Sequence, residues 1–145
     1  MVKRVLIGVA IGVGLAIVSQ ILLLGISMLA GAVGLHVYES APTAAASDPA
    51  WVQSMNLLFL LTAIPMLIVT YVVGLLMRVA GLGDGAVLGV TWAVVVLLVF
   101  VVIGLGNGTI AILTTLGAWV FFAAVLVCPV LAGLRPRPAR AARAV

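Results

Sequence analysis

Four long apolar stretches limit what this chain can fold into. They cover approximately residues 5–35, 52–77, 86–105 and 110–134, and none of them contains a charged side chain. A helix of about 20 mostly apolar residues crosses the hydrocarbon core of a bilayer, which is about 30 Å thick. The sequence therefore predicts an all-α integral membrane protein, a four-helix transmembrane bundle that forms a single domain over residues 1–145.

The composition excludes the main alternatives to a membrane protein. Hydrophobic residues make up 66% of the chain and charged residues 7%, whereas soluble domains average about 45–50% and about 25%. The single cysteine, Cys128, has no partner for a disulfide scaffold. No stretch alternates apolar and polar residues with a period of two, as barrel strands do. Backbone polar groups must form hydrogen bonds inside a bilayer, so helices are the structure that remains for these stretches.

The links between the stretches carry turn and capping residues. Asp48 and Pro49 are typical of a helix start, with an N-cap followed by proline at the first helical position. Residues 81–85 combine glycines with Asp84, which could cap the third helix, and residues 104–109 suffice for a tight helical hairpin. All three links are short, so we expect neighbouring helices to be antiparallel.

The basic residues indicate the orientation, because Lys and Arg in short loops stay on the cytoplasmic side. Lys3 and Arg4 precede the first stretch, Arg78 follows the second, and the remaining arginines follow the last. If the N- and C-termini are both cytoplasmic, all seven basic residues lie on the cytoplasmic side. Residues 135–145 then form a basic cytoplasmic tail, in which we expect anionic lipid headgroups to contact Arg135, Arg137, Arg140 and Arg143.

The tail has one alternative role, the binding of a cytoplasmic protein partner. We expect no nucleic acid partner, because the tail is short and has no aromatic residue on which bases could stack. We therefore attribute the positive net charge of the chain, +4, to its membrane topology rather than to a nucleic-acid-binding surface.

Small residues recur every four positions along the first stretch. With this spacing Gly8, Gly12, Ala16 and Gln20 share one face of a helix. Glycines allow another backbone to approach, and the Gln20 amide could hydrogen-bond across the contact. We interpret this face as a packing surface against the other helices of the chain. Dimerisation or docking on a partner subunit is one alternative, and a polar site for a substrate is another.

A few uncharged polar residues lie within the stretches. Asn56, Thr62 and Thr70 fall in the second stretch. Pro65 lies between them, removes one backbone hydrogen bond and is expected to kink the helix. Together with Gln20, the three polar residues are candidates for lining a polar pathway. Further candidates in the last two stretches are Thr91, Thr114 and Thr115.

No Asp, Glu, Lys, Arg or His residue lies deep within the stretches, and this restricts the chemistry. Proton relays, ion-coupled transport and counter-ion sites use buried ionisable residues. One histidine and one cysteine cannot form a bis-histidine haem site or a closed metal site, so we expect no cofactor. His36 and Glu39 of the first external loop could act as an acid–base pair. The simpler interpretation is an interfacial histidine and a solvated glutamate.

These features favour a small multi-pass membrane protein that is not an enzyme. The leading hypothesis is an accessory or structural subunit that packs in a homo-oligomer or in a larger membrane complex. The alternative is a small homo-oligomeric transporter or channel for a neutral or lipophilic solute, and a third hypothesis is a membrane enzyme that uses His36 and Glu39. Arginine in place of lysine, with abundant alanine, glycine and valine, is typical of a GC-rich bacterial genome. We therefore expect the bacterial cytoplasmic (inner) membrane.

Overall fold

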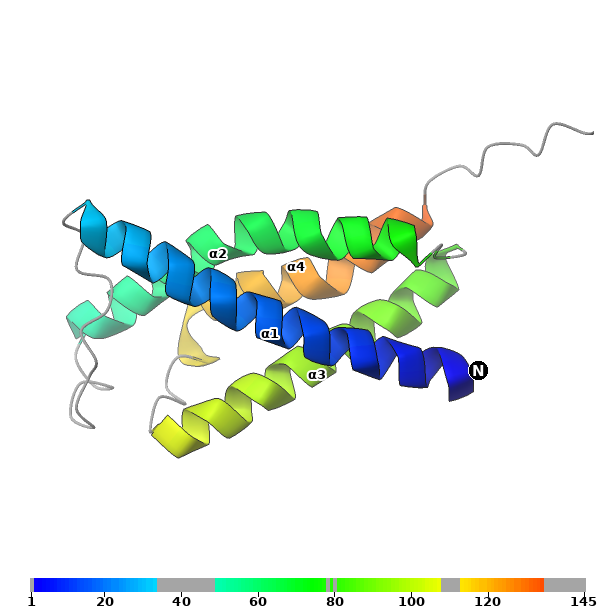
Figure 1. Cartoon of the computed structure of the whole chain (residues 1–145), viewed down its shortest axis with the longest axis horizontal. Coiled ribbons are helices and arrows are strands. Elements are labelled where there is room, and N and C mark those ends of the chain that lie inside the picture. Colours follow the sequence, from blue (N-terminus) through cyan, green and yellow to red (C-terminus); the bar gives the residue numbers. More distant parts are fainter. Residues whose placement is uncertain (1, 34–48, 78, 80, 108–112, 135–145) are drawn as a thin grey trace, which may run out of the picture.

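The computed structural model describes residues 2–33, 49–77, 79, 81–107 and 113–134. Within these ranges each helix is long and apolar enough to cross a membrane. The predicted all-helical, multi-pass membrane bundle is confirmed at this level (Figure 1). The helices are α1 (Val2–Ala32), α2 (Pro49–Leu76), α3 (Leu82–Asn107) and α4 (Leu116–Gly133).

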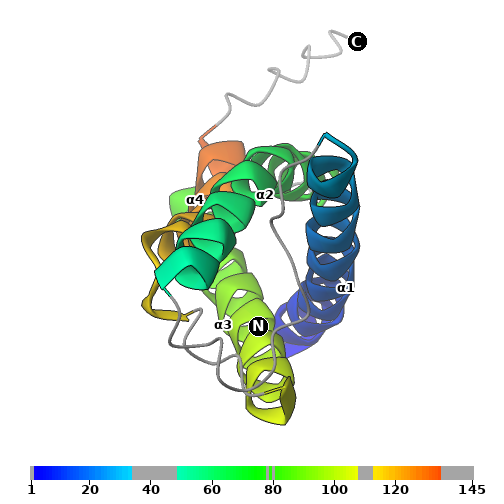
Figure 2. The ribbon, with the colours of Figure 1, turned by 90° about the vertical axis from the view of Figure 1, so that its left-hand side faces the viewer.

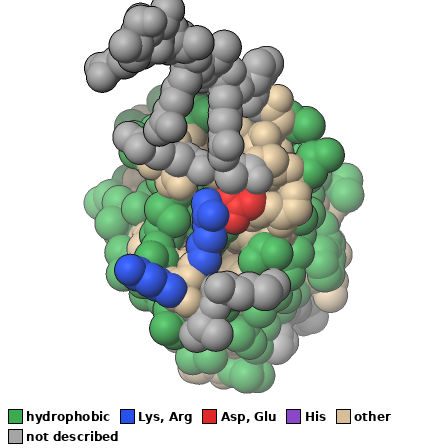
Figure 3. Space-filling model, turned by 90° about the vertical axis from the view of Figure 1, so that its right-hand side faces the viewer, with side chains coloured by type: hydrophobic (Ala, Val, Ile, Leu, Met, Phe, Trp, Pro, Cys, Tyr) green, Lys and Arg blue, Asp and Glu red, His purple; other side chains and the backbone are tan. Residues whose placement is uncertain are grey.

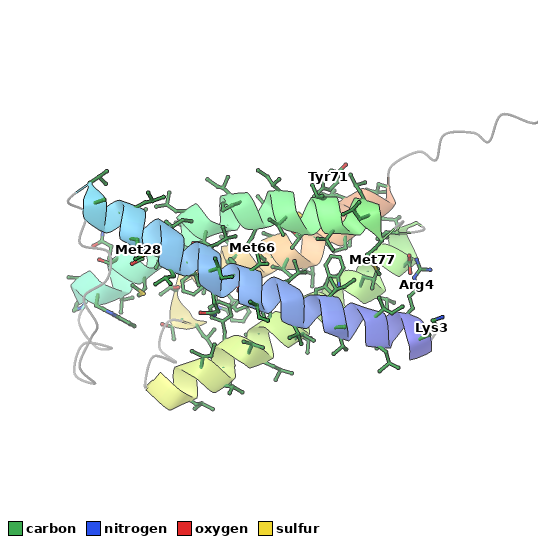
Figure 4. The ribbon with its side chains drawn as sticks, in the orientation of Figure 1. Lys3, Arg4, Met28, Met66, Tyr71 and Met77 are labelled. Atoms are coloured by element: carbon green, nitrogen blue, oxygen red, sulfur yellow. The ribbon has the colours of Figure 1, made fainter. Side chains whose placement is uncertain are left out.

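The helices form a ring around a shared core (Figure 2). α2 packs most extensively against α4, α4 also packs against α3, α3 against α1, and α1 closes the ring against α2. The start of α1, the end of α2, the start of α3 and the end of α4 lie together at one end of the bundle (Figure 1). We name this the basic end, because it carries Lys3 and Arg4 (Figure 4). The other end is named the far end.

Apolar side chains fill the centre of the ring. Met66, Trp92 and Phe121, from three different helices, are fully buried. In a bilayer the hydrophobic effect does little to hold helices together, so close packing of this kind has to supply the stability. Four aromatic rings contribute to it through tilted or edge-on contacts with centroids 5.4–5.8 Å apart: Phe59, Phe100, Phe121 and Phe122.

α3 is longer than the sequence predicts. Gly81 has a φ of 87°, a conformation that favours glycine, and its carbonyl accepts a hydrogen bond from the backbone N of Gly85 at 3.1 Å. The helix therefore includes Asp84 in its first turn, instead of following Asp84 as a cap. At the far end α3 continues through Gly104, where the sequence predicts a hairpin turn. Continuing the helix keeps the backbone hydrogen-bonded, which a bilayer demands.

α4 is shorter than predicted and begins at Leu116 instead of at about residue 110. Thr115 has extended backbone angles, φ −81° and ψ 143°, so the helix begins at the residue after it. Its side-chain oxygen accepts a hydrogen bond from the backbone N of Ala118 at 3.3 Å, as an N-cap does. The boundary differs from the prediction because residues 110–113 are as apolar as the helix itself, so hydrophobicity does not mark it.

Two glycines bring α3 close to α4. A Cβ atom added to Gly85 would lie 2.6 Å from the carbonyl oxygen of Pro129, and one added to Gly89 would overlap the carbonyl oxygen of Leu126. Only glycine lets the two backbones approach this closely. The pair has the same four-residue spacing as the glycines of α1, but Gly85 falls in a segment that the sequence predicts as a link. The four-residue spacing therefore does not predict the contact of Gly85 and Gly89 with α4.

Candidate functional site

A polar contact inside the bundle lies where α4 begins. Asn56 of α2 accepts a hydrogen bond through its Oδ1 from the backbone N of Gly117, at 2.6 Å. Thr115 accepts one from Ala118, and the preceding Thr114 is exposed. The first turn of a helix leaves backbone N–H groups without intrahelical partners, and these two side chains satisfy two of them. We name Asn56, Thr115, Gly117 and Ala118 the α4 cap.

The α4 cap lies between the far end and the middle of the bundle. Pro49, the first residue of α2, and Asn56 are separated by about 10 Å along the helix axis. Figure 1 shows the start of α4 nearer to the middle of the bundle than the start of α2 or the end of α1. Side-chain partners for N–H groups matter most at such a depth, because a bilayer core offers no water.

Gly117 makes this contact between α2 and α4 possible. An added Cβ atom would overlap the carbonyl oxygen of Asn56 and would lie 2.9 Å from its Oδ1. A larger residue would push α4 away from α2 and break the hydrogen bond. Asn56 and Gly117 are 61 residues apart in the chain, so no local spacing could have identified Gly117 as a site residue.

The groups of the α4 cap are all neutral. A carboxamide, a hydroxyl and two backbone N–H groups can form hydrogen bonds, but they supply neither a charge nor a titrating proton near neutral pH. Within the described ranges, no group of three or more His, Cys, Asp or Glu residues could hold a metal ion. The chemistry of the α4 cap is therefore hydrogen bonding alone.

Three threonines among the other predicted lining residues bond within their own helices. Thr62 and Thr70 are fully buried, and their hydroxyls donate to the carbonyls of Leu58 at 2.7 Å and Met66 at 2.6 Å. Thr91 donates in the same way to a carbonyl of α3, at 2.7 Å. Such local bonds occupy the hydroxyl donor. These donors are thus used inside the helices instead of being offered to a solute.

The predicted glycine face of α1 lies against α3 of the same chain. Gly8, Gly12 and Ala16 are buried. A Cβ atom added to Gly8 would lie 3.1 Å from Cδ2 of Leu88, and one added to Gly12 would lie 3.0 Å from Cβ of Val95. The structure therefore places these glycines in a helix contact within the chain.

Gln20 is the fourth member of that face and carries a side-chain amide nitrogen, Nε2. This Nε2 atom is buried and has no partner among the residues that the structure describes, and the indole nitrogens of Trp51 and Trp92 share this property. Trp92 lies in the central core, while Trp51 packs beside Ala30 in a smaller cluster near the far end. Among the residues that the structure describes, no group accepts a hydrogen bond from this nitrogen across the α1 contact.

An ion pair joins α1 to α3 at the basic end. Nη2 of Arg4 lies 2.6 Å from Oδ2 of Asp84, and the two side chains are 46% and 15% exposed. Figure 3 shows an acidic side chain in direct contact with a basic one on this end of the molecule, and Figure 4 shows Arg4 pointing toward the start of α3. Because Asp84 lies in the first turn of α3, the helix dipole also favours its carboxylate.

The remaining predicted site residues lie outside the described residues. They are His36 and Glu39 of the external loop and the four tail arginines, Arg135, Arg137, Arg140 and Arg143. Their roles as an acid–base pair and as contacts for anionic lipid stay predictions.

The chain matches no protein-family model, no curated protein and no solved structure. The described residues supply four kinds of contact inside the bundle: the α4 cap, the bonded threonines, the glycine contacts and the ion pair at the basic end.

Proposed function

We propose that this protein is a non-catalytic accessory or structural subunit that packs in a homo-oligomer or in a larger membrane complex. The observation that supports this most is that interior polar groups form their hydrogen bonds inside the bundle itself. Asn56 fixes α4 to α2, and the hydroxyls of Thr62 and Thr70 bond within α2. The centre between the helices is filled by aromatic and other apolar side chains. Such an interior suits packing better than a reaction or a polar pathway.

We further propose that neighbouring helices are antiparallel in the bacterial cytoplasmic membrane, with both termini on the cytoplasmic side. The position of Lys3 and Arg4 supports this, because the ends of α2 and α4 lie at the same end of the bundle. In the sequence these two helix ends lead directly to Arg78 and to the arginine-rich tail. The positive-inside rule then assigns the basic end to the cytoplasm, where anionic headgroups are the partners of the tail.

The alternative function is a small homo-oligomeric transporter or channel for a neutral or lipophilic solute. Gln20 is the observation that favours it, because the amide nitrogen has no partner among the described residues. An unpaired amide in apolar surroundings costs about 1–3 kcal/mol, which a solute with a hydrogen-bond acceptor would recover.

One purification followed by two measurements distinguishes the two functions. The tagged protein is extracted from its own membranes in mild detergent and analysed by native mass spectrometry, and then reconstituted into liposomes. A subunit is expected at a fixed stoichiometry, with itself or with another polypeptide, and its liposomes should be no more permeable to glycerol and urea than protein-free liposomes. A strictly monomeric protein would contradict the subunit proposal.

A permeable preparation would establish the alternative only if permeation depends on the polar side chain. Gln20→Leu removes the amide while keeping the size of the side chain, and Ile21→Leu on the exposed side of α1 is the matched control. If glycerol or urea permeates through wild-type protein and through the Ile21 variant, but not through the Gln20 variant, the subunit proposal is wrong.

The proposed orientation has its own test. A fluorescent protein fused to the C-terminus should fluoresce, because it folds in the cytoplasm, while an alkaline phosphatase fusion at the same position should be inactive. Activity of the phosphatase fusion together with a dark fluorescent fusion would place the C-terminus outside and overturn the proposed orientation.

A further inference from the structure

We draw no further inference here: the strongest candidate, the exposed apolar strip of α1 formed by Ile17, Ile21 and Leu24 beside Gln20, carries no proposal because nothing in the structure shows what covers it.

Discussion

The contacts of α4 and the contact of α1 with α3 both use glycine, but they differ in what the glycine faces. At Gly85, Gly89 and Gly117, an added Cβ would meet backbone atoms of the facing helix. At Gly8 and Gly12 it would meet only side-chain carbons of α3. The contacts at Gly8 and Gly12, at 3.1 and 3.0 Å, are relieved by a shift of a few tenths of an ångström. Those at Gly85, Gly89 and Gly117 are shorter and involve backbone atoms, which move only with their helix. α4 is therefore held at a fixed distance from its neighbours, and α1 is held at an adjustable one.

Burial follows the same division. Half of the 18 residues of α4 are buried inside the bundle. In an apolar segment of the same length in α1, 28% of the residues are buried. Because a bilayer stabilises helix association mainly through packing, the contacts of α4 should contribute more to stability than the contacts of α1. Substitutions in the two regions test this difference directly.

The largest effect is expected for Gly89→Ala. The new methyl group would overlap the carbonyl oxygen of Leu126, so α3 and α4 must separate. Overpacking costs about 1–3 kcal/mol, and we expect a loss of about 3 kcal/mol in the free energy of unfolding because backbone cannot repack. The measurement is unfolding by SDS in detergent micelles, followed by circular dichroism. Gly14→Ala is the matched control, since its Cβ would meet no atom within 4 Å. Equal stability of both variants would refute the fixed contact.

Asn56→Ala should have the next largest effect. It removes the acceptor for the backbone N of Gly117, and losing a helix cap costs about 0.5–2 kcal/mol. The same SDS titration should show the loss, and exchange of the Gly117 amide hydrogen should become faster. Gln53→Ala removes an exposed amide from the same helix and should leave both readouts unchanged. An unchanged exchange rate in the Asn56 variant would mean that this side chain does not cap α4.

Gly12→Ala should cost less than either of these substitutions. Its methyl group would lie 3.0 Å from Cβ of Val95, so a small shift of α1 can relieve the contact. Alanine also favours the helix over glycine by about 1 kcal/mol, which offsets the crowding. We expect a net change below about 1 kcal/mol in the same titration. A loss as large as that of Gly89→Ala would show that the two regions do not differ in rigidity.

Arg4→Ala should have the smallest effect. The arginine is 46% exposed, and ion pairs of this kind contribute about 0.2–1 kcal/mol. The loss should shrink further as salt is raised, because salt screens exposed charges. Thermal unfolding in detergent at low and high NaCl measures this, with Lys3→Ala as the control. The double variant Arg4→Asp, Asp84→Arg should recover part of the stability. A loss that is independent of salt would point to packing of the arginine instead.

The sequence predicts the helices well and their ends poorly, for different physical reasons. A long uncharged apolar run has only one stable backbone in a bilayer, so the four helices follow from hydrophobicity. The ends depend on single groups that hydrophobicity does not register. The carbonyl of Gly81 starts α3 before Asp84, and Thr115 starts α4 after four further apolar residues.

The candidate site shows the same limit. Asn56 stands out in the sequence as a polar residue within an apolar run, but its role depends on Gly117, which is distant in the chain. Thr62 and Thr70 look equally suited to line a pathway until their bonds to their own helix are known. Composition and spacing can therefore nominate polar residues in a membrane helix, while only the packing of the helices assigns their partners.

The shortness of α4 also affects the lipid around the protein. Its 18 residues rise about 27 Å, while the 31 residues of α1 rise about 46 Å. Both helices expose large apolar side chains, such as Leu131 on α4 and Leu29 on α1. The protein thus presents a hydrophobic belt of uneven height, which lipids match by thinning locally and helices by tilting. Lipid beside α4 therefore meets a shorter helix than lipid beside α1, on the perimeter of one molecule.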